Sequence, residues 1–492
     1  TSPHSFPTRR SSDLAGFWLA RDLVTGAALP ELLDAATVVF VPIFNVDGHE
    51  RFGANNRPNQ RGPEEMGFRT NAAGLNLNRD FVKVDTPEMA ALLGLWRRWD
   101  PTLFVDLHTT DGAKFEHDVA VMVAPKASRG DDLEAAGRAL QGALIERVTA
   151  AGHLPLAFYP SFDVDDDPSS GFTDGDAPPR FSQAYATTRN RLGILVETHS
   201  WRTYPERVAS TRHVLEAVLA EAAAHGRHWR DVEAAADAAD RGVAGKRVVL
   251  MSRADPAAPR TIDFRGYRYQ RVPSEVSGGT WTQYDETQPE VWHLPLRDHL
   301  VPALTLTAPG AGYVIDGGYA AAIAPRLAAH GLRYQQVADD ADLDAEVWRI
   351  ARPTFGRTFE GRTAATITGA WTRERRRAVH GAIFVPVAQP GARLILHMFE
   401  PSAPDALVAW GLFNAALEQK EYMEPYVAEE VARGLLKDPA IAAAFAEALK
   451  DPAFAADPAR RLDWFYRRSP AWDERMGLIP VFRVDAAPAL AP

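Results

Sequence analysis

The chain has 492 residues, of which 46% are hydrophobic and 24% charged, and its formal net charge is −10. These values are typical of a globular protein with two or three domains. The negative net charge argues against nucleic acid as a partner, and no Lys/Arg run is long enough to change this expectation. The absence of cysteine excludes disulfide bonds and thiolate metal sites. No apolar run reaches the ~18 residues that a membrane span needs.

The first fourteen residues are unlike the rest of the chain. They contain no apolar core of a signal peptide, and residues 5–14 resemble a translated sequencing adapter. We therefore predict that residues 1–14 are a non-native leader and that the native sequence resumes near Ala15. A native disordered tail is the alternative.

Residues 15–240 alternate strand-like apolar runs with amphipathic helical patterns. A continuous apolar run such as 37–44 is typical of a strand buried on both faces. We expect strands over 37–44, 102–107, 118–123 and 191–197, and helices over 15–24, 86–99, 131–151 and 205–225, the last followed by a second helical stretch to about 238. Loops are expected over 45–80 and 159–180. This order predicts an α/β fold with a mixed, mostly buried sheet and flanking helices.

The pattern changes after about residue 242. Residues 243–400 are rich in Val, Thr, Tyr and Trp with frequent Pro and Gly, which predicts a β-rich accessory region with one helix over 320–330. Residues 401–492 are predicted to be mostly helical. Helices are expected over 407–420, 425–436, 440–450 and 458–468.

Four short segments carry the polar groups of a candidate site. They are Phe-Asn-Val-Asp-Gly (44–48), Leu-Asn-Leu-Asn-Arg-Asp (75–80), Val-Asp-Leu-His (105–108) and Ile-Leu-Val-Glu-Thr-His (194–199). A guanidinium such as that of Arg79 can donate two parallel hydrogen bonds to a carboxylate. Glu197 closes an apolar strand, and glutamate is rarely buried there for packing alone. The strand before His108 would fix its imidazole rigidly.

In this order, the segments resemble the M14-type zinc carboxypeptidases (metallocarboxypeptidases). The resemblance covers residues 38–197, less than half of the chain, and it implies a carboxypeptidase-like fold for residues 15–240. It implies that Asn78 and Arg79 hold the C-terminal carboxylate of a substrate. It also implies an arginine that stabilises the developing oxyanion. Arg69 is our choice for that role, and the loop length also allows Arg61 or Arg57.

The same resemblance implies a zinc ion in the intact parent enzyme. His108 is then a metal ligand, and Glu197 is the general base and acid of the reaction. Asp106 lies two residues before His108 and could orient it. No tyrosine matches the family's substrate-capping position clearly, and Tyr185 is the candidate.

Two departures from the family pattern bear on activity. The His-x-x-Glu zinc motif should lie about one helix before residue 37, which falls before Ala15. We therefore expect an N-terminally truncated chain that binds zinc weakly and is itself inactive, because a zinc site needs at least three protein ligands. Asn76 stands where many relatives have an aspartate that orients the first ligand.

Other metal-like patterns are expected to be coincidental. His213-Val-Leu-Glu216 lies on a helix after Glu197, in the wrong order. A two-histidine site that combines His108 with His199 is a weak alternative. The acidic stretch 163–167 lacks the later Gly and Glu of a calcium loop.

Three functions remain open at this point. The first is a zinc-dependent carboxypeptidase acting on peptides, and the second is a related deacylase that releases an amino acid from a small acyl-amino-acid substrate. The third is a non-catalytic relative. The resemblance implies export to the periplasm or medium of a bacterium. The sequence does not indicate an oligomeric state.

Overall fold

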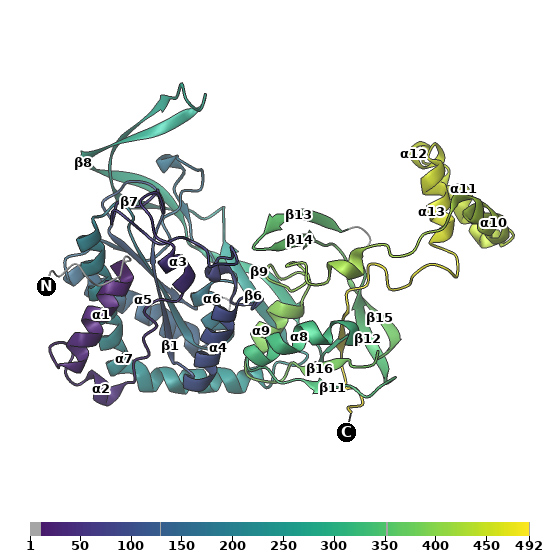
Figure 1. The fold of residues 1–492 in the computed structure, drawn as a ribbon, viewed down its shortest axis with the longest axis horizontal. Coiled ribbons are helices and arrows are strands. Elements are labelled where there is room, and N and C mark those ends of the chain that lie inside the picture. The colour runs from purple at the N-terminus through teal and green to yellow at the C-terminus, as the bar shows by residue number, and fades with distance from the viewer. Residues whose placement is uncertain (1–10, 128, 351–352, 492) are drawn as a thin grey trace.

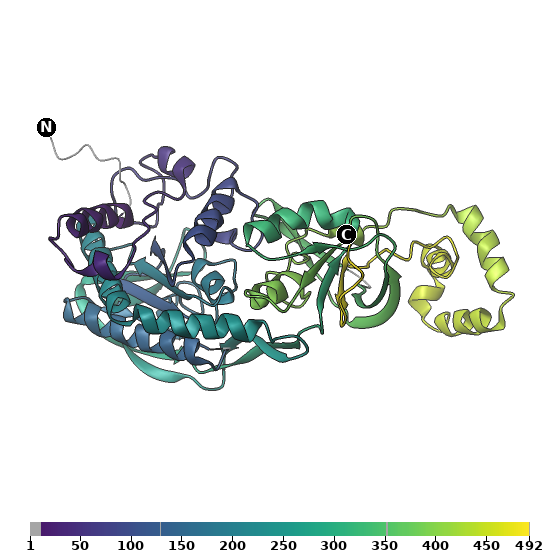
Figure 2. The ribbon, with the colours of Figure 1, turned by 90° about the horizontal axis from the view of Figure 1, so that it is seen from below.

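The computed structural model describes residues 11–127, 129–350 and 353–491. Figure 1 shows an α/β unit built from the N-terminal half, a second unit beside it, and a group of C-terminal helices that projects from the second unit. Figure 2 shows the same projection of the C-terminal helices from below. Of the leader predicted over 1–14, residues 1–10 lie outside the described residues, and the remainder is helical.

The N-terminal half alternates helices and strands in the predicted manner. Its elements are α1 (Ser11–Val24), α2 (Leu32–Ala35), α3 (Val46–Glu50), the 3-10 turn η1 (Leu77–Arg79), α4 (Pro87–Trp99), β1 (Leu103–Thr109), β2 (Val119–Ala124), α5 (Asp132–Ala150), β3 (Pro155–Leu156), η2 (Pro168–Ser170), β4 (Phe172–Thr173), α6 (Ser182–Thr188), β5 (Leu192–Thr198) and α7 (Tyr204–Asp240). The two helical stretches expected after residue 205 form the single helix α7.

The central sheet is mixed, with the strand order β1-β5-β2-β3. Strand β1 runs parallel to β5, which runs antiparallel to β2. Side chains alternate between the two faces of the sheet. Ile194 and Val196 pack with α5 and α7 in one core, whereas Leu195 packs in another with Phe264 and Trp292 of the β-rich region. Glu197 shares the face of Leu195. The predicted α/β fold with a mixed sheet and flanking helices is confirmed.

The strand predicted over 37–44 is not present. Residues 37–44 form neither a strand nor a helix, and Val38, Val39, Phe40 and Val41 are 37–47% exposed. Strand β1 is an edge of its sheet, and residues 37–44 line the same cavity as β1 without pairing with it. An apolar run becomes a strand only where another strand offers its backbone groups, and among the described residues none pairs with this segment.

The second half begins with β hairpins. Its elements are β6 (Arg247–Ala254), β7 (Arg260–Pro273), β8 (Thr280–Arg297), β9 (Leu300–Thr307), β10 (Gly312–Ile315), α8 (Gly317–Ala329), β11 (Gln335–Gln336), β12 (Asp342–Trp348), β13 (Thr354–Phe359), β14 (Arg362–Thr366), β15 (Trp371–Arg377), β16 (Ile383–Pro386), α9 (Ala392–Phe399), η3 (Asn414–Leu417), α10 (Pro425–Leu435), α11 (Pro439–Ala448), α12 (Pro452–Ala455), α13 (Pro458–Tyr466) and β17 (Val481–Val484).

A six-stranded sheet organises this second half, with the order β11-β16-β10-β17-β12-β15. Strand β17 returns from the C-terminal region to the middle of the sheet, so the sheet crosses the expected boundary at residue 400. Helices α10–α13 are present, but residues 407–420 form turns and η3 instead of the expected helix. No helix among the described residues is long and apolar enough to cross a membrane.

Candidate active site

His108 and Glu197 are direct neighbours on the parallel strands β1 and β5. The register aligns them as partners, so both side chains stand on the same face at the carboxyl ends of the two strands. His108 Nε2 lies 2.8 Å from Asp106 Oδ2. This ion-pair geometry agrees with the predicted orienting role of Asp106, two residues earlier on the same face.

Glu197 is buried, with 7% of its surface exposed. Burial raises the pKa of its carboxyl to about 7, and the nearby carboxylates of Asp106 and Asp111 act in the same direction. His108 and Arg57 oppose this rise in pKa without cancelling it. A carboxyl with a pKa near neutrality can both accept and return a proton, which is the property of a general base and acid.

Asn78 and Arg79 lie in η1, within a loop over residues 75–80 that we call the anchor loop. Asn76 caps the turn, because its side-chain oxygen accepts a hydrogen bond from the Asn78 N–H at 3.1 Å. The Arg79 guanidinium lies over the Phe181 ring at 4.6 Å and donates to the Asn78 carbonyl at 2.6 Å. The Asn78 amide oxygen is buried and has no hydrogen-bond partner among the described residues.

The surroundings of Arg79 disfavour its positive charge. Burial lowers the pKa of its guanidinium, and the charges of Arg180 and Arg69 lower it further. Glu360 and Tyr159 act in the opposite direction. A guanidinium in this environment is expected to attract an anionic group of a ligand.

The Asn-x-Asp-Gly segment builds the loop that carries Arg69. Asn45 accepts a hydrogen bond from the Gly48 N–H and donates to the Arg69 carbonyl at 3.1 Å. Asp47 accepts from the Ala72 N–H at 2.9 Å. A Cβ on Gly48 would lie 2.6 Å from the carbonyl oxygen of Phe68, so the two backbone segments approach closely only because this residue is glycine. The segment is therefore structural support for the site.

Replacing Asn45 with alanine should remove both of these contacts. We expect the free energy of unfolding to fall by about 1–2 kcal/mol, the usual cost of a lost cap. Urea unfolding of Asn45→Ala measures this. Asn55→Ala, an exposed change in the same loop, is the control, and equal stability of the two variants would contradict the role of Asn45.

The three arginines considered for the oxyanion role have different acidic partners: Arg69 and Arg57 pair with one carboxylate, and Arg61 with another. Arg69 Nη2 lies 2.9 Å from Asp111 Oδ2, and Arg57 reaches the same carboxylate at 3.8 Å. Arg61 pairs with Glu286 of β8 at 2.8 Å. Arg69 and Arg57 therefore share one acidic partner at the site, and Arg57 is one of the charges that act on Glu197.

Tyr185 is not a substrate-binding residue. It is 1% exposed, and its hydroxyl forms a 2.9 Å hydrogen bond with His330 Nδ1 inside the core. Tyr159 is the tyrosine at the site. It is 40% exposed, and the charges of Glu197, Asp111 and Arg69 act on its hydroxyl, whose pKa is raised chiefly by burial. Sequence reasoning missed Tyr159 because it lies in a turn-rich loop without a motif.

One cavity of about 1650 Å³ brings the candidate residues together. Its lining includes the predicted residues Arg69, Asn78, Arg79, His108 and Glu197, together with Asp111 and Tyr159, which were not predicted to have a role. The cavity continues along β1 to residues 37–44. It therefore brings a guanidinium, a buried carboxyl and an imidazole into one space.

The described residues do not fit a zinc ion. They contain no group of three or more His, Cys, Asp or Glu side chains that could hold a metal. His213 bonds to His153 at 2.7 Å, and Glu216 pairs with Arg212, so this pair is not a ligand set. His199 is 2% exposed and stacks on Phe115 at 4.0 Å. Among the histidines considered from the sequence, His108 is the one that lines the cavity.

Comparison with known proteins agrees with the motifs. Residues 11–113 match the Peptidase_M14 family model, described as zinc carboxypeptidase. The matched part contains Asn78, Arg79, Arg69 and His108, and the resemblance to the zinc carboxypeptidases is confirmed. The description names zinc, as the resemblance implied. A search of curated proteins finds no match.

Solved metallo-carboxypeptidases are among the similar structures. The protein from Burkholderia cenocepacia is 19% identical, with a TM-score of 0.31, over 44% of this chain and 54% of that chain. The protein from Pseudomonas aeruginosa, in complex with (2-guanidinoethylmercapto)succinic acid, is 17% identical, with a TM-score of 0.31, over 44% of this chain and 55% of that chain. The chain thus spans about half of the length of these two proteins.

Proposed function

We propose that this chain is a carboxypeptidase-type hydrolase that recognises the free C-terminal carboxylate of a peptide. The observation that carries the proposal is the shared cavity, in which Arg79 and Asn78 lie with Glu197 and His108. The family match supports the class of reaction, because it names zinc carboxypeptidase.

Each side chain has a distinct task in this proposal. Arg79 and Asn78 bind and orient the C-terminal carboxylate, which places the last peptide bond near the strand ends. Glu197 takes a proton from water and returns it to the leaving amine, a cycle that its pKa of about 7 permits. Arg69 donates to the oxyanion that develops on the carbonyl. Tyr159 covers the bound residue from the loop after β3.

The incomplete set of metal ligands favours a second function, which is binding without catalysis. Because the described residues offer no three-ligand group, the chain would in this case bind C-terminal carboxylates without cleaving the peptide. Binding and hydrolysis therefore need separate tests.

Zinc titration tests the metal-ligand set directly. We expect isothermal titration calorimetry of the chain to give a dissociation constant no tighter than micromolar, because one histidine cannot hold zinc firmly. His108→Ala should not change the result measurably. Submicromolar binding of one zinc ion, lost in His108→Ala, would show that a complete site exists and would contradict this expectation.

Binding of N-acetyl-L-phenylalanine tests the recognition step without requiring activity. We expect the acid to bind and its C-terminal amide to bind much more weakly, as titration calorimetry or ligand-observed NMR would show. Equal binding of acid and amide would contradict carboxylate recognition. A panel of peptides and N-acyl amino acids would then separate a peptidase from a deacylase.

A further inference from the structure

The anchor loop is held in place by a residue from the accessory region. We propose that Glu360, at the tip of the β13–β14 hairpin, is a positioning residue for Asn78 and Arg79. The carboxylate anchor is then complete only when this hairpin is docked on the N-terminal unit. This inference rests on the proposed function, because it assigns a role to the hairpin in binding the substrate carboxylate.

The turn of the hairpin carries an unfavourable residue. Phe359 pairs with Arg362, which leaves Glu360 and Gly361 as a two-residue turn with φ values of 50° and 72°. Such turns favour Asn-Gly or Gly-Gly, because both central residues need a positive φ. A glutamate there is strained relative to asparagine or glycine. Its side chain must therefore gain from a contact elsewhere.

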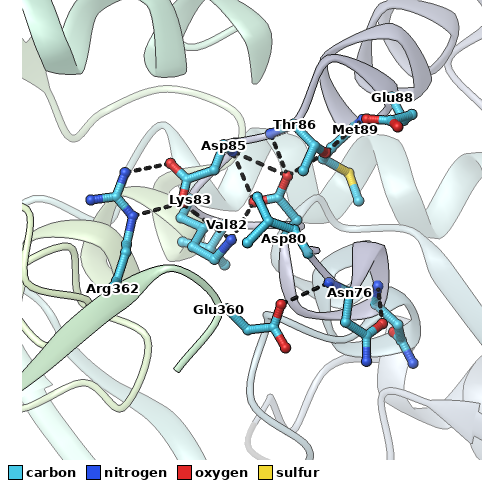
Figure 3. A network of polar contacts seen from close by, with 12 residues as sticks. Asn76, Asp80, Val82, Lys83, Asp85, Thr86, Glu88, Met89, Glu360 and Arg362 are labelled. Carbon is cyan, nitrogen blue, oxygen red and sulfur yellow. Dashed lines mark hydrogen bonds and ion pairs between the residues drawn. The ribbon is translucent and has the colours of Figure 1, made fainter. Parts of the chain in front are cut away.

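That contact is with the backbone of the anchor loop (Figure 3). The Asn76 N–H donates a hydrogen bond to Glu360 Oε2 at 2.7 Å, across 284 positions of sequence. Asn76 in turn accepts the N–H of Asn78 through its side chain and the N–H of Arg79 through its carbonyl, at 3.1 and 3.0 Å. The carboxylate of Glu360 thus holds Asn76, and Asn76 in turn holds the backbone of Asn78 and Arg79.

A partly buried ion-pair network docks the hairpin beside this contact. Arg362 donates two hydrogen bonds to Asp85, at 2.6 and 2.5 Å, and Arg326 of α8 donates to the same carboxylate at 2.7 Å. Lys83, fully buried, bridges Asp85 and Asp80. Asp80 ends the anchor loop, and Lys83 and Asp85 follow it. The hairpin therefore contacts the chain within the loop, at Asn76, and again just after it, at Asp85 (Figure 3).

The charge of Glu360 acts on Arg79, but the two side chains do not form an ion pair among the described residues. Its charge is close enough to raise the pKa of Arg79 against the effects of burial and Arg180. Within the part of the chain that the structure describes, no ion pair joins the two side chains. The guanidinium therefore stays open to a ligand carboxylate while the loop beneath it is held.

Glu360→Asn separates this role from stability. Asparagine suits a positive φ better than glutamate, so the hairpin should be at least as stable as before. Its side chain is one methylene shorter and cannot reach the Asn76 N–H. We expect binding of N-acetyl-L-phenylalanine to weaken by about threefold to tenfold, the effect of one hydrogen bond, with an unchanged or higher melting temperature.

Two further variants make the test specific. Glu360→Gln keeps an acceptor at the original length and should bind the ligand within about twofold of the wild type. Glu275→Asn, an exposed change at the β7–β8 turn, should also leave binding unchanged. Wild-type affinity in Glu360→Asn, or equal losses in Glu360→Asn and Glu360→Gln, would overturn the positioning role alone. A wild-type protein that does not prefer the acid to its amide would overturn the proposed function as well.

Discussion

Arg79→Ala is expected to weaken the binding of N-acetyl-L-phenylalanine by about tenfold to hundredfold, because hydrogen bonds to charged groups contribute ~1.5–3 kcal/mol. The guanidinium lies half-buried against Phe181, beside the buried amide of Asn78. Removing it leaves the carboxylate of the ligand without its main partner. Titration calorimetry at a fixed ionic strength measures the loss.

The control for this prediction is a substitution of the same type far from the cavity. Arg467→Ala removes an exposed arginine that directly follows α13 and pairs with Asp463 of that helix, and it should bind the ligand like the wild type. Arg79→Lys should recover part of the affinity, because lysine keeps the charge but not the two parallel donors. An Arg79→Ala variant within twofold of the wild type would rule out Arg79 as the anchor.

Glu197→Gln is expected to stabilise the protein, and more strongly at high pH. The folded-state pKa of Glu197 is about 7, raised from 4.5. Because the folded state holds this proton more tightly than the unfolded state, the stability of the wild type falls as pH rises from about 4.5 through 7. The gain from Glu197→Gln should therefore grow from under about 1 kcal/mol at pH 5 to about 3 kcal/mol at pH 8.

Urea unfolding at the two pH values measures this difference. Glu290→Gln, an exposed change on β8, should show no comparable dependence on pH. A destabilised Glu197→Gln, or a gain that does not change with pH, would mean that the carboxyl is already satisfied as a charged group. The stabilised variant should also lose any hydrolytic activity, because an amide cannot take a proton from water as a carboxylate does. Such a gain in stability with a loss of activity is common at functional sites.

Several parts of this molecule could be predicted from residue order alone. The apolar runs before His108 and Glu197 identified β1 and β5, because buried strands have a plain local signature. Their pairing in a common register is seen only in the structure, because the sequence pattern does not say which strands are neighbours. The role given to Arg79 rests on residue type, since a guanidinium suits a carboxylate in any fold, and it stays a prediction.

The errors arose where structure depends on distant partners. Residues 37–44 have the composition of a buried strand, yet a strand forms only beside another strand, and no local pattern reveals that partner. Tyr185 was assigned from its place in the chain, whereas its helix α6 turns the side chain into the core.

Residues without a motif were missed for a related reason. Asp111 and Tyr159 reach the cavity from loops, whose course has no periodic signal. Glu360 contacts Asn76 from 284 positions away. Such a contact depends on how the accessory region docks, which no short segment encodes.

A crystal structure of the chain with bound N-acetyl-L-phenylalanine would test the central claim most directly. We expect the carboxylate oxygens of the ligand to lie about 2.7–2.9 Å from the guanidinium nitrogens of Arg79, the distance of charge-assisted hydrogen bonds. The amide of Asn78 should contact the same carboxylate, and the acyl group should point toward Glu197. A ligand bound outside this cavity, or one whose carboxylate faces solvent, would contradict the account.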